Sequence, residues 1–193
     1  MDLIQPTREL LEGLRAPVLA SFLAEWPDTT QRRAAPAPAL LPVVGWLDQA
    51  AGAAPAFCRE LVTALASTAR EMTWKQTYTA AQMGAAFLQN YGWCEMIGAS
   101  GAVPSERLAC GFLLLGRDTL YPRHHHEAEE IYIPLVGTAA WEKGDEGWRE
   151  QRPGTVIHHP SRVSHAMRTS DEPLLALYLW RSDNLRQKAQ LLS

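Results

Sequence analysis

The sequence has no histidine in its first 123 residues, no strong excess of one charge and no long apolar run. Its 18 basic and 21 acidic residues give a formal net charge of −3, which excludes a protein that binds nucleic acid through a basic surface. Apolar stretches stay far below the ~20 residues of a membrane span. The first residues also lack the basic start of a secretion signal. We therefore expect a cytoplasmic protein with neither a nucleic-acid nor a membrane partner.

Cysteine is also scarce. Cys58, Cys94 and Cys110 lie far apart with no CxxC pair, a pattern typical of reduced structural thiols. Hydrophobic residues make up 47% of the chain, which excludes a disordered protein. The 193 residues suffice for one domain with a buried core.

The first half of the chain reads as helical. Residues 7–25 show the i, i+3, i+4 apolar spacing of one buried helix face. Thr7 is the expected N-cap, and Pro17 predicts a kink. Further helices are expected at residues 43–51, 55–70 and 79–89. These alanine-rich helices favour packing against another element, as a lid over a site or as a dimer surface.

After about Gly92 the apolar runs become short and are separated by turn residues. Strands are expected at residues 93–97, 107–115, 119–125, 130–135, 138–142, 147–150, 155–158, 164–168 and 174–180. Such spacing favours a sandwich or barrel. We expect a mainly β protein: a helical segment (1–92) packing on a β-barrel (93–182), followed by a short helical tail (183–193).

All six histidines lie between His124 and His165. Alternation along a strand places His124 and His126 on one face. A hairpin would bring His126 to the same side of a sheet as Glu130 and Tyr132. Two or three imidazoles with one carboxylate are a transition-metal set, favouring zinc or iron and leaving manganese, nickel and cobalt open.

The other residues of the two clusters are expected to serve no ligand role. His125 and His159 should point outward if their strands are regular, and His158 could lie in a turn. Arg123 and Arg162 read as solvated surface residues.

These residues resemble the two motifs of the cupin superfamily. The first, G(X)5HXH(X)3,4E(X)6G, matches from His124 through Glu130 to Gly137, although Gly116 lies two positions early. The second, G(X)5PXG(X)2H(X)3N, matches at Gly154, Pro160 and His165. Two residues depart from it, with Arg162 in place of glycine and Thr169 in place of asparagine. The resemblance implies a cupin double-stranded β-helix, or jelly-roll barrel, that binds one metal.

The segments YPRHHHEAEEIYIPLVGTAAW and YLWRSDN, with the chain length and helical first half, resemble the cupin-type dimethylsulfoniopropionate lyases. That resemblance implies His126, Glu130, Tyr132 and His165 as ligands of one divalent metal, with His124 beside them. It also implies a carbon–sulfur lyase that forms dimethyl sulfide and acrylate by β-elimination.

The chemistry of this substrate suggests roles for further aromatic residues. A phenol beside a divalent cation is more acidic, so Tyr132 is the candidate general base. Tyr121 and Trp180 could face the sulfonium cation, and Tyr91 and Trp93 are weaker candidates. Tyr121 could instead assist proton transfer or bind the carboxylate, and His124 is placed near the substrate.

Two other functions remain open at this stage. An Fe(II) cupin dioxygenase or isomerase acting on a small carboxylate could use the same His/Glu set. A ligand-binding cupin without catalysis would need no phenol beside the metal. A monomer and a homodimer are both compatible with the sequence.

Overall fold

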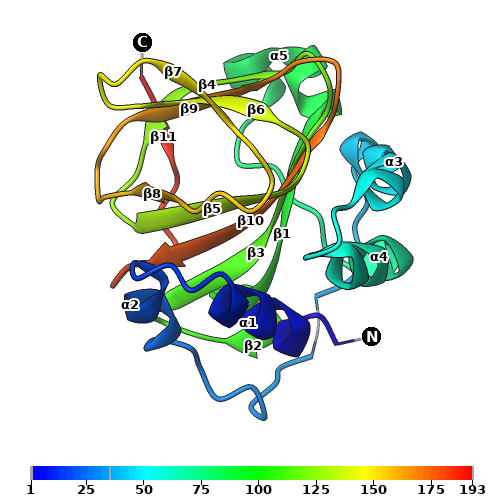
Figure 1. The fold of residues 1–193 in the computed structure, drawn as a ribbon, viewed down its shortest axis with the longest axis vertical. Coiled ribbons are helices and arrows are strands. Elements are labelled where there is room, and N and C mark those ends of the chain that lie inside the picture. The colour runs from blue at the N-terminus through cyan, green and yellow to red at the C-terminus, as the bar shows by residue number, and fades with distance from the viewer. Residues whose placement is uncertain (1, 35, 193) are drawn as a thin grey trace.

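The computed structural model describes residues 2–34 and 36–192, with the helices first and the strands after them (Figure 1). The helices are α1 (Ile4–Gly13), α2 (Leu19–Leu23), α3 (Leu47–Ala53), α4 (Arg59–Thr68) and α5 (Ala80–Gln89), with the 3-10 turns η1 (Pro42–Trp46) and η2 (Ala69–Glu71). The strands are β1 (Tyr91–Gly98), β2 (Val103–Pro104), β3 (Leu108–Leu115), β4 (Leu120–His125), β5 (Glu129–Val136), β6 (Ala139–Lys143), β7 (Trp148–Gln151), β8 (Ile157–His159), β9 (His165–Thr169), β10 (Leu174–Arg181) and β11 (Gln190–Leu191). The nine predicted strands are confirmed to within two residues at each end.

The kink predicted inside the first helix is also confirmed. Residues 14–18 form a turn between α1 and α2 that contains Pro17, and Arg15 has a φ of 51°. The N-cap prediction for Thr7 is wrong because α1 begins earlier, at Ile4. Thr7 lies inside the helix, where its buried hydroxyl donates to the Leu3 carbonyl at 2.7 Å.

The strands form two sheets. The first has the order β2-β1-β3-β10-β5-β8, and the second has the order β11-β4-β9-β6-β7. Side chains on one face of the first sheet join an aromatic core in the barrel, among them Tyr132 and Tyr178. Alternate residues such as Phe112 and Leu177 pack with the helices on the opposite face. Both faces of this sheet are therefore buried, which explains its nearly continuous apolar strands.

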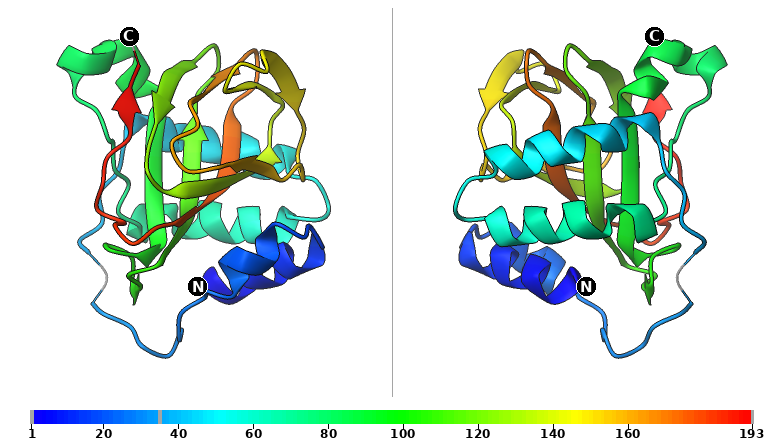
Figure 2. Two further views of the ribbon diagram at one scale, coloured as in Figure 1. Left: turned by 90° about the vertical axis from the view of Figure 1, so that its left-hand side faces the viewer. Right: turned by 90° about the vertical axis from the view of Figure 1, so that its right-hand side faces the viewer.

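The helices take different positions around this sheet (Figures 1 and 2). Side chains of α1 to α4, such as Phe22 and Leu65, are buried against the outer face of the first sheet. Phe87 of α5 instead packs with Tyr121 at one end of the barrel. Within the described residues, the helices are too short or too polar to cross a bilayer.

The helical tail expected over residues 183–193 is wrong for the part that the structure describes. Residues 183–192 contain a turn at residues 185–186, run along the barrel (red in Figure 2) and include β11, which pairs with β4. Leu185, Ala189 and Leu191 pack against the aromatic core while Arg186 and Lys188 are exposed. This two-residue alternation and the open edge of β4 outweigh the helical propensity of the segment.

Close backbone packing makes one glycine of β3 sensitive to substitution. A Cβ at Gly111 would overlap the carbonyl oxygen of Cys94 on the paired strand. We expect Gly111→Ala to lower the free energy of unfolding by about 1–3 kcal/mol or more, as overpacked cores do. Thermal unfolding would measure the loss, with Gly13→Ala, which meets no atom within 4 Å, as the control. Equal melting temperatures for the two variants would contradict this account.

Candidate metal centre

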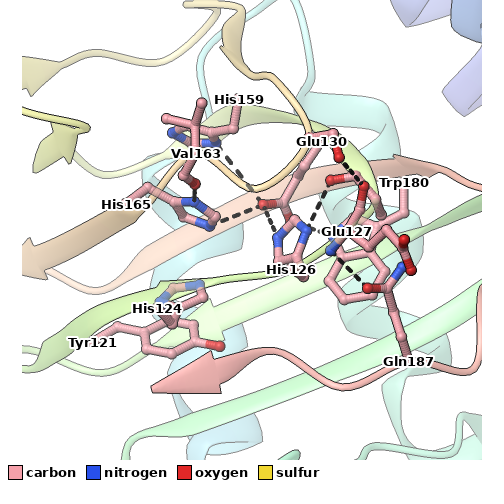
Figure 3. A network of polar contacts seen from close by, with 12 residues as sticks. Tyr121, His124, His126, Glu127, Glu130, His159, Val163, His165, Trp180 and Gln187 are labelled. Atoms are coloured by element: carbon pink, nitrogen blue, oxygen red, sulfur yellow. Dashed lines mark hydrogen bonds and ion pairs between the residues drawn. The ribbon is translucent and has the colours of Figure 1, made fainter. Parts of the chain in front are cut away.

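Glu130 lies at the centre of a buried group of histidines inside the barrel (Figure 3). Its Oε2 atom is 2.9 Å from Nε2 of His126, 3.1 Å from Nε2 of His165 and 3.8 Å from Nδ1 of His159. His124 completes the group, with its ring centroid 4.2 Å from that of His165. Each of these five side chains is at most 4% exposed.

The strand register explains why these residues converge. Glu130 on β5 is paired with Trp180 on β10 at one side and with His159 on β8 at the other. Residues directly opposite one another in antiparallel strands project from the same face of the sheet. In the second sheet His124 is paired with His165 across β4 and β9. The two sheets thus bring ligand atoms together from opposite walls of the barrel.

Backbone carbonyls orient three of the imidazoles. Nδ1 of His124 lies 2.8 Å from the Pro122 carbonyl, Nδ1 of His126 lies 2.9 Å from that of Ala128, and Nδ1 of His165 lies 3.0 Å from that of Val163. A carbonyl oxygen only accepts, so each Nδ1 donates a proton. This leaves the Nε2 lone pairs free, as in histidines that ligate metals.

The electrostatics of the group favour a bound cation. Burial alone would raise the pKa of the Glu130 carboxyl, but His126 and His165 outweigh it and hold that pKa well below its usual range. Burial also lowers the pKa of His124 far below its usual value and that of His159 to about 2, so both stay neutral. A buried carboxylate among lone-pair donors fits a divalent transition metal.

The structure brings His124, His126, Glu130 and His165 together as the sequence indicated. Two triads have ligand atoms that all lie within 4.8 Å of one another: His124, His126 and His165, and Glu130, His159 and His165. The prediction that His159 points outward is wrong, because its side chain is fully buried. The turn after β8, where Arg162 has a φ of 65°, interrupts the alternation on which that prediction depended.

Tyr132 lies on the same face of β5 as Glu130, and both side chains line one cavity. Burial raises the pKa of the Tyr132 phenol well above its ordinary value, and the Glu130 carboxylate adds to this effect. The phenol is therefore protonated at neutral pH unless a nearby cation stabilises the phenolate.

The two other aromatic candidates contact this group of histidines and Glu130 directly. The Tyr121 ring stacks on His124 with centroids 4.1 Å apart, and its hydroxyl lies 3.0 Å from that of Tyr78. Trp180 donates its indole N–H to Oε1 of Glu130, and its ring lies 4.3 Å from that of His126. Tyr78 was not expected at this position, and no motif marks it in the sequence.

The neighbours of these residues project away from the centre. His158 lies 2.7 Å from the Glu129 carboxylate, which also contacts Arg181. Arg162 is largely exposed and pairs with Glu127. Successive side chains of a strand point to opposite faces. His159 and Glu130 therefore lie inside the barrel, whereas their neighbours His158 and Glu129 lie outside it.

The two departures from the second cupin motif have structural explanations. Arg162 replaces a glycine in the left-handed region, and its backbone N–H is held there by the His126 carbonyl at 2.8 Å. Thr169 replaces asparagine, and its hydroxyl donates to the Gly116 carbonyl at 2.6 Å while accepting from the Thr119 N–H. The Arg162 contact therefore holds the turn after β8 against His126, and the Thr169 contacts join the end of β9 to the loop between β3 and β4.

A cavity of about 300 Å³ opens onto the centre. Glu130, Tyr132 and Trp180 are among its barrel residues, and residues 185–189 of the C-terminal segment also line it. Gln187 in this segment accepts the backbone N–H of Glu127 at 2.6 Å. The volume suits a small ligand. The C-terminal segment, which the sequence predicted as a helix, thus forms part of the cavity wall.

The cysteines are unsuited to a role in this chemistry. Cys58, Cys94 and Cys110 are buried and unpaired. Burial raises the thiol pKa of Cys58 to about 11 and that of Cys94 to about 12. They remain thiols at neutral pH, and a thiol is a much weaker nucleophile or ligand than a thiolate.

Comparison with known proteins agrees with this architecture. Residues 18–176 match the sequence model of the dimethylsulfoniopropionate lyase family. The chain is 38% identical over 110 residues to dimethylsulfoniopropionate lyase DddQ of Ruegeria pomeroyi, covering 57% of this chain and 55% of that protein. The match to DddL of Cereibacter sphaeroides is 34% over 125 residues, covering 64% and 51%. These alignments span about half the length of the curated relatives.

Solved structures give longer alignments. A chain from the crystal structures of the DMSP lyases RdDddP and RnDddQII is 30% identical with a TM-score of 0.88, covering 99% of this chain and 96% of that one. Crystalline DddQ of Ruegeria pomeroyi is 28% identical with a TM-score of 0.79, covering 95% and 96%. A cupin 2 barrel protein of Rhodopseudomonas palustris is 14% identical with a TM-score of 0.50, covering 63% and 78%. The predicted cupin barrel is confirmed.

Proposed function

The chain belongs to the dimethylsulfoniopropionate lyase family, and on that premise we propose that it cleaves dimethylsulfoniopropionate to dimethyl sulfide and acrylate in a metal-dependent β-elimination. The observation that supports this most strongly is the shared cavity of Glu130 and Tyr132. In that cavity a phenol that could act as a base lies beside a carboxylate that could hold a metal. The reaction is redox-neutral, and its products are the two fragments of one substrate.

His126, Glu130, His165 and the Tyr132 oxygen would hold the metal. When bound, a divalent ion would act as a Lewis acid toward the substrate carboxylate and would lower the pKa of that phenol. Zinc and iron suit this ligand set best, and manganese, nickel and cobalt can use it as well. The inward-facing Nε2 atoms of His126 and His165 support this assignment.

Tyr132 acts as the general base in this proposal. Its phenolate oxygen takes the proton from the carbon next to the substrate carboxylate. The electron pair of that C–H bond forms the new double bond, and the C–S bond electrons leave with neutral dimethyl sulfide. The proton then passes from Tyr132 to solvent. A positioned base contributes roughly 10²–10⁴-fold to such a step.

The aromatic residues of the cavity would orient the two ends of the substrate. Trp180 is held by its hydrogen bond to Glu130 and presents part of its ring to the cavity, where it can face the sulfonium. Such a cation–π contact is worth about 0.5–2 kcal/mol. Tyr121, stacked on His124, would direct its hydroxyl toward the carboxylate end. Together these contacts would align the reacting C–H bond with Tyr132.

Metal removal tests the proposed function directly. Purified protein should release dimethyl sulfide from dimethylsulfoniopropionate, and complete chelation should slow the release at least about 100-fold, because Lewis-acid stabilisation contributes several kcal/mol. Gas chromatography of the headspace measures the product, and added zinc or iron should restore it. Release that persists at the same rate after full metal removal would reject the metal dependence. No release from metal-loaded protein would reject the substrate.

A further inference from the structure

Tyr78 is a buried tyrosine that meets the cavity wall at Tyr121. Its hydroxyl lies 3.0 Å from the Tyr121 hydroxyl, and the two rings meet edge to face with centroids 5.9 Å apart. Tyr121 lines the cavity, whereas Tyr78 does not and is 6% exposed. Tyr121 also stacks on His124, so its ring is held from two sides. The Tyr78 hydroxyl can therefore affect a ligand in the cavity through Tyr121.

The segment before α5 fixes the place of Tyr78. The Gln76 amide donates to the carbonyls of Leu88 and Tyr91 at 2.6 and 2.9 Å. The Thr77 hydroxyl is hydrogen-bonded to the Tyr91 hydroxyl at 2.9 Å. These contacts tie the segment to the end of α5 and the start of β1. The fold itself therefore sets the position of the Tyr78 hydroxyl, before any ligand is bound.

The protons of the two hydroxyls decide which of them can serve a ligand. Burial raises the pKa of Tyr78 to about 12 and that of Tyr121 well above its ordinary value, so both are neutral at neutral pH. A neutral hydroxyl has one proton to donate and two lone pairs. When Tyr121 donates to an anion in the cavity, the proton in its bond to Tyr78 must therefore come from Tyr78. Within the described residues the Tyr78 hydroxyl has no other hydrogen bond, so its proton is available.

We propose that Tyr78 is a positioning residue, whose hydroxyl donates to Tyr121 and so directs the Tyr121 proton to the substrate carboxylate. The inference rests on the proposed function, in which Tyr121 faces that end of dimethylsulfoniopropionate. Negative charge on the carboxylate grows as the adjacent carbon loses its proton. A donor aimed at it stabilises the transition state more than the bound substrate. The Tyr78 hydroxyl should therefore act on kcat more than on KM.

Tyr78→Phe tests this role because it removes one oxygen and keeps the ring. We expect kcat to fall about tenfold and KM to change less than about twofold, since one hydrogen bond of the chain is lost.

Thr79→Ala is the matched control for a disturbance of the same segment. The Thr79 hydroxyl is exposed and donates to Gln82 at 3.2 Å at the start of α5. Both variants should unfold at a lower temperature than wild type, because each loses a hydrogen bond. Only Tyr78→Phe should lose activity, and kcat of Thr79→Ala should stay within about twofold of wild type. An equal loss of kcat in the two variants would overturn the inference.

A double substitution separates positioning from an independent effect. Tyr121→Phe should lower kcat about 100-fold, as the loss of a donor aimed at developing charge does. If Tyr78 acts through Tyr121, adding Tyr78→Phe to that variant should lower kcat no further. Two independent effects would instead multiply to about 1,000-fold. That multiplied loss, or wild-type kcat in either single variant, would overturn the inference.

Acrylate binding distinguishes a failure of this inference from a failure of the proposed function, because calorimetry of binding requires no turnover. Tyr78→Phe should weaken acrylate binding about threefold when Tyr121 is present and should leave it unchanged in Tyr121→Phe. This pattern in a protein that releases no dimethyl sulfide would support the positioning role and reject only the substrate. A wild-type protein that neither releases dimethyl sulfide nor binds acrylate would overturn both.

Discussion

Tyr132→Phe should lower kcat by about 10²–10⁴-fold and leave the metal content close to that of wild type. The variant removes one oxygen from a side chain that lies beside Glu130 in the cavity and keeps the ring that packs in the barrel core. Proton abstraction loses its base, whereas the imidazoles and the Glu130 carboxylate remain. Rates of dimethyl sulfide release and metal analysis of the purified variant measure the two effects.

Tyr178→Phe is a suitable control for this substitution. Tyr178 is paired with Tyr132 across β10 and β5 and lines the same cavity. Its buried hydroxyl has no hydrogen-bond partner among the residues that the structure describes. Its loss should change kcat by less than about tenfold. Near-normal turnover in Tyr132→Phe would reject the phenol as base. A variant that loses its metal would instead show that the phenol is an essential ligand.

The residues of the centre could be predicted from the sequence where they lie within a few positions of one another along the chain. His126 and Glu130 are four residues apart at the start of one hairpin, so the chain itself keeps them close. His165 was placed by the spacing of a second motif, which combines a glycine turn with a proline. Both patterns depend on short segments whose geometry changes little with tertiary context. The order of helices and strands followed from apolar periodicity for the same reason.

The parts that were missed depend on pairing between distant segments. Strand parity alone cannot orient His159, because its face is set by the register with Glu130 and by a turn in which Arg162 adopts a positive φ. The C-terminal segment has residues of good helical propensity, yet it becomes β11 because β4 offers an open edge. Its alternation of Leu185, Ala189 and Leu191 was a usable but weak signal.

The helical segment shows the same limit. Its periodicity predicted buried faces correctly, but did not reveal which surface they would contact. The structure places Phe22 and Leu65 against the outer face of the first sheet, away from the aromatic interior. Only α5, through Phe87, approaches Tyr121 beside the centre. Most of the helical segment therefore supports the sheet that positions Glu130 and Tyr132.

Glu130→Gln should have the largest effect on metal binding, because the carboxylate supplies the negative charge of the centre. The amide keeps the shape of the side chain, and its oxygen can still accept the Trp180 indole N–H that Glu130 accepts now. What is lost is the charge that faces His126, His159 and His165. We expect Zn²⁺ affinity to fall more than about 100-fold, since losing only a partner of a ligand costs 10–100-fold. Turnover at limiting metal should fall below detection.

Glu129→Gln provides the matched control, because the adjacent residue points to the other face of β5. Its carboxylate pairs with Arg181 and His158 instead of the centre. Removing it should cost about 1 kcal/mol of stability or less, as partly exposed ion pairs do, and leave Zn²⁺ affinity unchanged. Chelator competition on both variants measures the difference between the two faces. Equal Zn²⁺ affinities for Glu129→Gln and Glu130→Gln would contradict a metal site inside the barrel.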